Sequence, residues 1–200
     1  MRNWLAVGLL TLALVLAASF RGREDDARGL SQIVASVRSG DVVLLEGTSI
    51  RGRIVQWLNS KSDFSHVGVV KVEEGKVFLL HADPLLGCVQ EEMDRLFVRC
   101  RFRDALVLRP SDAAAALRAV SFCSRAVERH AAFNDSFRYL QGSGYYCTEF
   151  VLRAYDAAGA RLLSGTRAGS ILFPEELLES PALARVPRES SESPEGDRVD

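Results

Sequence analysis

Cys147 is the residue of this sequence best placed to act as a nucleophile. It begins a predicted helix that runs from about Tyr146 to Ala158, on the same face as Phe150 and Ala154, which are spaced to be buried. At the first turn of a helix, free backbone N–H groups and the positive end of the dipole favour an anion, and so they lower the pKa of a thiol. The same N–H groups can stabilise an oxyanion. The sequence therefore predicts a thiolate that attacks a carbonyl carbon.

Two of the three histidines are placed to act as the base of such a nucleophile and as the group that orients the base. His66 opens one predicted strand and His81 closes the next, and a turn at Glu74–Gly75 joins the strands into a hairpin. Residues equally distant from the turn lie opposite each other, and the two histidines are nearly equidistant from it. We expect His66 to be the base and His81 its partner. His130 suits the C-terminal end of a helix dipole and is left out.

Three further residues have both a functional and a structural interpretation. The Tyr146 hydroxyl either lines a substrate cleft or belongs to a packed aromatic ring. Asp135 either lines the substrate groove or forms part of a turn. Glu149 is expected to point away from the Cys147 face and to act on the helix dipole only. No two cysteines form a C-x-x-C motif and the histidines are scattered, so the sequence predicts no metal site and no cofactor.

The periodicity of apolar residues predicts the elements that must position these side chains. A mostly buried strand precedes the hairpin, and another strand and a long alanine-rich helix follow it, with Ser111 as the helix N-cap. Cys123 falls on the apolar face of that helix and is expected in the core. The predicted strands are 41–46, 67–72, 76–80 and 104–108, and the predicted helices are 30–37, 50–58, 111–130, 146–158 and 174–178.

Composition limits the class of protein. At 200 residues, 48% hydrophobic and 26% charged, the chain has the makeup of one globular domain. Its net charge of -1 gives no electrostatic footprint for nucleic acid, so we expect no nucleic-acid partner.

The first residues have the layout of a secretory signal. Arg2 precedes an apolar run that ends in small residues, with possible cleavage after Ala17 or Ser19. An uncleaved membrane anchor through residues 4–20 is the competing interpretation, and a buried helix is a third. We therefore expect residues 1–19 to direct export to the periplasm or cell envelope, 28–187 to form the domain, and 188–200 to be a disordered acidic tail. In an oxidising compartment Cys88 and Cys100 can pair, although the sequence does not set the connectivity.

Four segments, in this order, resemble the YiiX-like group of the circularly permuted NlpC-type papain-like hydrolases. They are Ser39–Leu44, Asp63–Val70, Tyr145–Tyr155 and Ile171–Leu177, and the resemblance covers about residues 38–187. It implies an α+β fold in which an antiparallel sheet packs against helices, with the histidine-bearing strands before the nucleophile helix.

The resemblance also implies roles for the three candidate residues. Cys147 would be the nucleophile, His66 the general base and His81 the third polar residue, at a place where YiiX-like members are expected to have Glu. The implied activity is hydrolysis of amide bonds in cell-wall peptides. An acyl-lipid hydrolase or acyltransferase of the lecithin:retinol acyltransferase type is the alternative enzyme, and an inactive binding module is the non-enzymatic one.

Overall fold

The computed structural model describes residues 31–47, 64–100, 102 and 104–187. It has an α+β fold built on one six-stranded sheet of order β4-β3-β2-β1-β5-β6, in which every neighbouring pair is antiparallel. The elements in chain order are a helix over 31–36, β1 (Val42–Glu46), β2 (His66–Glu73), β3 (Lys76–Asp83), β4 (Gly87–Glu92), α3 (Met93–Cys100), β5 (Asp104–Pro110), α4 (Ala113–Glu128), α5 (Cys147–Ala157), the 3-10 helix η1 (Pro174–Glu179) and β6 (Leu183–Arg185).

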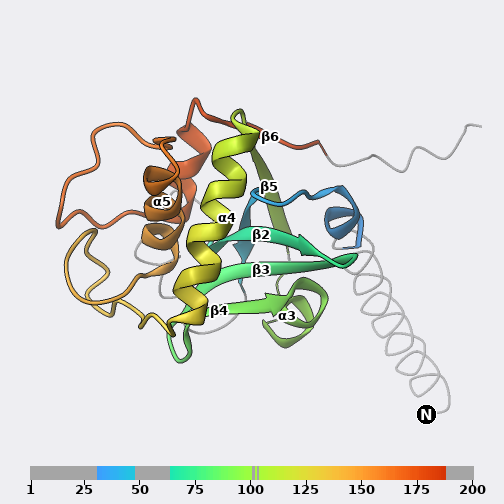
Figure 1. The fold of residues 1–200 in the computed structure, drawn as a ribbon, viewed down its shortest axis with the longest axis horizontal. Helices are drawn as coiled ribbons and strands as arrows, with labels where there is room; N and C mark the ends of the chain where they lie inside the picture. Colours follow the sequence, from blue (N-terminus) through green and yellow to red (C-terminus); the bar gives the residue numbers. More distant parts are fainter. Residues whose placement is uncertain (1–30, 48–63, 101, 103, 188–200) are drawn as a thin grey trace, which may run out of the picture.

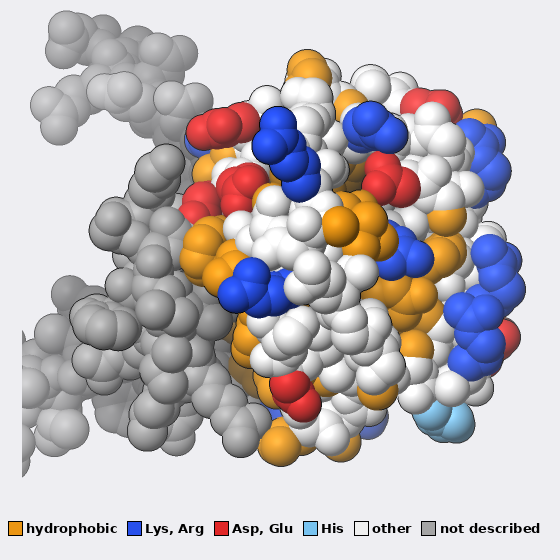
Figure 2. Space-filling model, turned by 90° about the vertical axis from the view of Figure 1, so that its left-hand side faces the viewer, with side chains coloured by type: hydrophobic (Ala, Val, Ile, Leu, Met, Phe, Trp, Pro, Cys, Tyr) orange, Lys and Arg blue, Asp and Glu red, His pale blue; other side chains and the backbone are white. Residues whose placement is uncertain are grey.

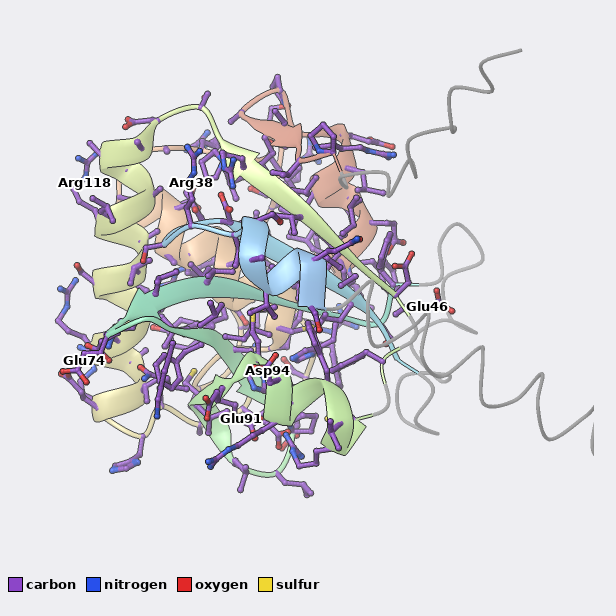
Figure 3. All side chains as sticks on the ribbon, turned by 90° about the vertical axis from the view of Figure 1, so that its right-hand side faces the viewer. Arg38, Glu46, Glu74, Glu91, Asp94 and Arg118 are labelled. Carbon is purple, nitrogen blue, oxygen red and sulfur yellow. The ribbon has the colours of Figure 1, made fainter. Side chains whose placement is uncertain are left out.

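Helices cover both faces of the sheet. Figure 1 shows α4 crossing the sheet with α5 beside it, and Figure 3 shows α3 and the 31–36 helix in front of the opposite face. Each face has its own core, because successive side chains of a strand point to opposite sides. The core under α4 and α5, here called the first core, includes Val42, Leu44, Val67, Val69, Leu80, Phe150 and Tyr155. The core under α3 and the 31–36 helix, the second core, includes Ile33, Val43, Leu45, Val70, Leu79, Leu96, Phe97 and Phe102.

The predicted hairpin forms, and its register is offset slightly from the expectation. Glu74 and Gly75 both have positive φ, at 50° and 76°, as a two-residue turn between twisted strands requires. Pairing runs from Glu73 with Lys76 to Val69 with Leu80. Continued along the strands, this register makes His66 and His81 diagonal neighbours on one face.

The structure contains three elements that the sequence did not predict. β4 carries Gln90, Glu91 and Glu92 and therefore lacks a continuous apolar pattern, α3 is short, and β6 has three residues. The N-cap of α4 is also different: Asp112, and not Ser111, accepts a hydrogen bond from the Ala115 N–H at 2.9 Å. The remaining strands and helices predicted within the described residues are present, with boundaries a few residues longer or shorter.

Several predictions lie outside the described residues. These are the signal or anchor at 1–19, the helix at 50–58 and the tail at 188–200. Among the residues that the structure describes, no helix is both long and apolar enough to cross a membrane.

The four cysteines are all free thiols. Cys88 pairs with Ala82 across the β3–β4 ladder and is buried in the first core, whereas Cys100 packs against the second core. The sheet thus lies between the two residues, which is why the disulfide that the sequence allowed between Cys88 and Cys100 is absent. Cys123 is fully buried in the first core, as expected.

A buried ion pair fixes the start of β1, the strand that β2 pairs with. Asp41 is 2% exposed and accepts hydrogen bonds from Arg109 Nε at 3.0 Å and Nη2 at 2.7 Å. It also accepts from the Arg38 N–H, while Arg109 Nη2 donates to the Ser36 carbonyl. One guanidinium therefore joins the 31–36 helix, β1 and β5.

Replacing Arg109 by Met should destabilise the fold strongly, because the Asp41 carboxylate would remain buried without its partner. We expect a loss of about 3–5 kcal/mol in the free energy of unfolding, measured by urea denaturation. The matched control is Arg95→Met, which breaks a pair with Glu92 whose arginine is 84% exposed. That change should lower stability by no more than about 1 kcal/mol. Equal effects of the two substitutions would contradict the role assigned to Arg109.

Candidate active site

Cys147 is the first residue of α5, as predicted, and its side chain is half-buried against the first core. The N-cap residue Tyr146 has extended backbone angles and makes no side-chain capping bond. Because no side chain caps this end, the first backbone N–H groups of the helix remain available near the thiol. The sulfur lies 4.0 Å from the hydroxyl oxygen of Thr148.

The thiol is protonated at neutral pH, contrary to the expectation from its place on the helix. Burial raises the pKa of the Cys147 thiol, and this effect outweighs the hydroxyl of Thr148 and the backbone N–H groups of Thr148, Val67 and Cys147 itself, which lower it. The helix end thus acts in the predicted direction, but the loss of water around the sulfur is the larger effect.

His66 and His81 are in direct contact. Nε2 of His66 and Nδ1 of His81 are 2.9 Å apart, and the two rings meet edge to face with centroids 4.9 Å apart. The other side of the His66 ring lies parallel to Phe102, at 6.5 Å between centroids. The expected pairing of the two imidazoles is therefore present in the structure.

Glu91 continues this chain of hydrogen bonds and was missed by the sequence analysis. Its Oε2 lies 2.9 Å from Nε2 of His81 and accepts a hydrogen bond of 2.5 Å from Nη2 of Arg99. β4 carries Glu91 and α3 carries Arg99, so both come from elements that the apolar pattern did not reveal. Figure 3 shows Glu91 beside α3. A carboxylate is thus the next group in this series of hydrogen bonds after His81.

The hydrogen bonds fix which ring nitrogen of each histidine carries the proton. The hydrogen bond from His81, with the Arg99 charge beside it, lowers the pKa of Glu91, so this group is a carboxylate and acts only as an acceptor. His81 therefore donates from Nε2, and in its neutral form it accepts at Nδ1. His66 donates from Nε2 in turn, which leaves the lone pair of its Nδ1 free to accept a proton.

His66 is neutral at neutral pH. Burial lowers its pKa well below 6.5, and the neighbouring His81 and Arg99 act in the same direction. The resting site therefore holds a neutral imidazole and a neutral thiol. Such a pair acts through general-base transfer of the thiol proton and not through a preformed ion pair.

Cys147 lies beside the start of β2, where His66 is the first residue. Among the described side chains, however, no direct hydrogen bond joins the Cys147 sulfur to the His66 ring. The backbone N–H of Val67, the residue after His66, acts on the Cys147 sulfur. The side chain of Val67 packs in the first core with α5, while the ring of His66 stacks on Phe102 of the second core. The alternation of side chains along β2 thus separates the ring from the sulfur.

The structure places Tyr146 and Asp135 differently from the functional interpretation. Tyr146 is 2% exposed, and its hydroxyl accepts a hydrogen bond from the Leu172 N–H at 3.3 Å. Burial raises its pKa, so it is a packed aromatic residue whose hydroxyl does not face a cleft. Asp135 is exposed in the turn that the sequence also allowed.

The segment that enters α5 is held close to the chain before it. Gly144 has φ +89°, and a Cβ at this position would lie 1.9 Å from the Ala132 carbonyl oxygen. That carbonyl accepts a hydrogen bond from the Tyr145 N–H at 3.0 Å, so only glycine permits the approach. A hollow of about 310 Å³ lies beside this segment. Arg153 is the charged residue that lines this hollow. Its Nη1 lies 4.0 Å from Oε1 of Glu149 and its guanidinium stacks over the Tyr145 ring, so the charge of Arg153 is partly neutralised.

The described part of the chain contains no group of three or more His, Cys, Asp or Glu side chains arranged to hold a metal ion.

Comparison with known proteins shows a likeness at the level of the fold. No family model matches the sequence, and no curated protein matches it. Among solved structures, the crystal structure of the metalloprotein YiiX from Escherichia coli O157:H7 matches with a TM-score of 0.62 and 16% sequence identity. The match covers 76% of this chain and 97% of the YiiX chain. The α+β fold described above is therefore similar to that of YiiX, which supports the resemblance to the YiiX-like group at the level of the fold.

Proposed function

We propose that this protein is a cysteine-dependent hydrolase of the permuted papain-like (NlpC-type) fold, with Cys147 as nucleophile and His66 as general base. The observation that carries the proposal is the chain His66–His81–Glu91, which leaves Nδ1 of His66 as a proton acceptor at the end of β2 where Cys147 lies. A hydrogen-bonded series of base and orienting groups beside a nucleophile is the arrangement that acyl transfer requires.

The first step forms a thioester. Nδ1 of His66 takes the thiol proton as the sulfur attacks the carbonyl carbon of an amide. The resulting oxyanion lies near the free N–H groups at the start of α5, which stabilise it. His66 then gives the proton to the leaving nitrogen, the carbon–nitrogen bond breaks and an amine departs. In the second step a water molecule loses a proton to His66 and attacks the thioester carbon. The carbon–sulfur bond breaks, His66 returns the proton to the sulfur, and the acid is released.

His81 and Glu91 orient the base and stabilise its charged form. When His66 accepts a proton it becomes an imidazolium whose Nε2–H still points at His81. An imidazole partner alone would stabilise this charge weakly, but the Nε2 of His81 lies 2.9 Å from the Glu91 carboxylate. The proposal requires Nδ1 of His66 and the Cys147 sulfur to lie within hydrogen-bond reach when substrate is bound.

Amide bonds of cell-wall peptides are the substrate class that we propose. The resemblance to the YiiX-like group supports this choice, as does the apolar stretch at residues 4–20, which suits export to the envelope. Acyl lipids are the second candidate, favoured by the exposed apolar side chains of Phe137, Leu140 and Ile171 near the start of α5. The two classes differ in the product, an amine from a peptide and a fatty acid from a lipid.

Incubation with fractionated envelope peptides and with acyl lipids should distinguish these classes and test the nucleophile. We expect mass spectrometry to find an acyl adduct on Cys147 and a released amine early in turnover, and the carboxylic acid afterwards. Cys147→Ala should lose these signals, whereas Cys100→Ala, which changes another half-buried cysteine, should keep them. Hydrolysis that survives Cys147→Ala would refute the proposed function.

Alkylation of Cys147 by iodoacetamide should follow the raised pKa of its thiol. The thiolate is the reactive form, so the rate should be low at neutral pH and should rise with a midpoint above pH 9. The same peptide in urea-unfolded protein is the reference and should react faster at pH 7. Because His66 is neutral at rest, His66→Ala should change this rate little while it abolishes turnover. A midpoint well below pH 9 would indicate a preformed thiolate–imidazolium pair instead.

Glu91→Gln should reduce kcat/KM by about tenfold or more, because the amide can donate to His81 and reverse both imidazole tautomers. Nitrogen chemical shifts of labelled histidines give the decisive measurement. In the unchanged protein Nδ1 of His66 should be unprotonated, and in Glu91→Gln it should gain a proton. Glu92→Gln alters the neighbouring carboxylate on the same strand and should leave both kcat/KM and the shifts unchanged. Unaltered shifts in Glu91→Gln would remove Glu91 from this role.

A further inference from the structure

The loop at residues 134–141 holds two large apolar residues in a strained backbone conformation. Phe137 has φ 54° and Leu140 has φ 59°, in the left-handed region that side chains other than glycine rarely adopt. Such strain persists only where the surrounding structure enforces it, and it is concentrated at sites that bind or react. The loop therefore requires a structural explanation and a functional one.

Two buried polar side chains enforce this conformation. Asn134 is 2% exposed, and its amide donates to the carbonyls of Arg138 and Gln141 and to Oε2 of Glu149. Glu149 is 1% exposed, and its Oε1 accepts a hydrogen bond of 2.9 Å from the Leu140 N–H. Glu149 lies in the first turn of α5, as predicted, and the structure gives it a further role, because its carboxylate is the buried anchor of the loop.

The loop presents apolar side chains to the solvent. Phe137 is 41% exposed and Leu140 is 49% exposed. The segment before Ile171, itself 51% exposed, lies alongside, since the Tyr139 N–H donates to Ser170 and the Gly169 N–H donates to Tyr139. We call Phe137, Leu140 and Ile171 the apolar lip. It borders the candidate site, because the Phe137 ring lies 5.9 Å from that of Tyr146, the residue before Cys147.

Arginines flank the apolar lip. Arg138 and Arg167 are exposed on the two segments that meet there, and Asp135 is the only acid on them, so residues 134–141 and 167–171 carry a net charge of +1. The whole chain carries -1. Figure 2 looks at this side of the molecule and shows apolar side chains with both Lys or Arg and Asp or Glu side chains around them. Apolar side chains flanked by two exposed arginines match the two layers of an anionic bilayer surface, its acyl boundary and its headgroups.

We propose that the apolar lip docks this protein on the surface of an anionic lipid bilayer, with Phe137, Leu140 and Ile171 at the acyl boundary and Arg138 and Arg167 among the headgroups. A second copy of the chain fits less well, because three half-exposed side chains offer far less than the ~800 Å² per partner that a stable dimer buries. The strained loop holds its side chains in place before binding, which reduces the entropy lost on docking.

Docking does not depend on the proposed hydrolase activity. Where both hold, the lip brings Cys147 to the membrane surface, and the substrates in reach are the headgroup-side amides or esters of amphiphiles. Cys147→Ala should therefore dock like the unchanged chain, and variants of the lip should still hydrolyse a soluble substrate. These two readouts separate a failure of docking from a failure of the proposed function.

Amide hydrogen exchange of the full chain tests the proposal, because it reports which segments meet the membrane. With vesicles of phosphatidylcholine and phosphatidylglycerol, residues 134–141 and 169–172 should exchange more slowly, and α3 should be unaffected. Pure phosphatidylcholine vesicles or added salt should weaken this protection. Arg138→Gln and Arg167→Gln should each reduce the affinity for the anionic vesicles by about fivefold, and the protection should weaken accordingly.

Replacing Phe137 and Leu140 together by Ser should remove the protection of residues 169–172. Val98→Ser, which changes an 81% exposed residue of α3, is the matched control and should leave the protection intact. Unchanged exchange in β2 and β3 checks that each variant is folded. Exchange at 134–141 and 169–172 that does not respond to anionic vesicles would overturn the proposal. So would protection that rises with protein concentration without vesicles, because that result indicates a dimer.

Discussion

The register of the β2–β3 hairpin determines which side chains meet at the candidate active site. A strand has a period of two, so a slip of one residue would send His66 or His81 to the opposite face of the sheet. The turn at Glu74–Gly75 and the pairing of Val69 with Leu80 prevent that slip. Nε2 of His66 and Nδ1 of His81 therefore lie 2.9 Å apart. The next pairing, of β3 with β4, then brings the Glu91 carboxylate to His81.

Burial then sets the protonation states of the site. It raises the pKa of the Cys147 thiol and lowers that of His66, so both groups are neutral at rest. Among the described residues, Glu91 and Arg99 form an ion pair beside the histidines. The Glu91–Arg99 ion pair lies outside the reacting pair of Cys147 and His66. It orients the imidazoles, and it stabilises positive charge on His66 only when His66 takes up a proton.

A second buried carboxylate organises the other side of Cys147. Glu149 and Asn134 use their hydrogen-bonding capacity to hold the loop at 134–141 beside the start of α5. An unpaired buried carboxylate is costly, so this loop and the helix are coupled in stability. The nucleophile, the segment that enters its helix and the apolar lip thus lie together on the first core, while the base and its partners lie on the side of the second core. The sheet separates the two cores, and the candidate site lies where β2 begins.

Local patterns in the sequence determined the hairpin, the helix that begins at Cys147, the burial of Cys123 and the pairing of His66 with His81. Each of these depends on a short-range period or a turn that neighbouring residues specify. Tertiary structure alone decided the rest. Glu91 and Arg99 were not predictable, because β4 and α3 have weak apolar patterns and reach His81 through pairing between strands. The raised thiol pKa, the free thiols of Cys88 and Cys100 and the buried role of Glu149 likewise depend on what packs around each group. Desolvation, separation by the sheet and long-range hydrogen bonds are properties of the folded chain, and the spacing of residues in a sequence does not encode them locally.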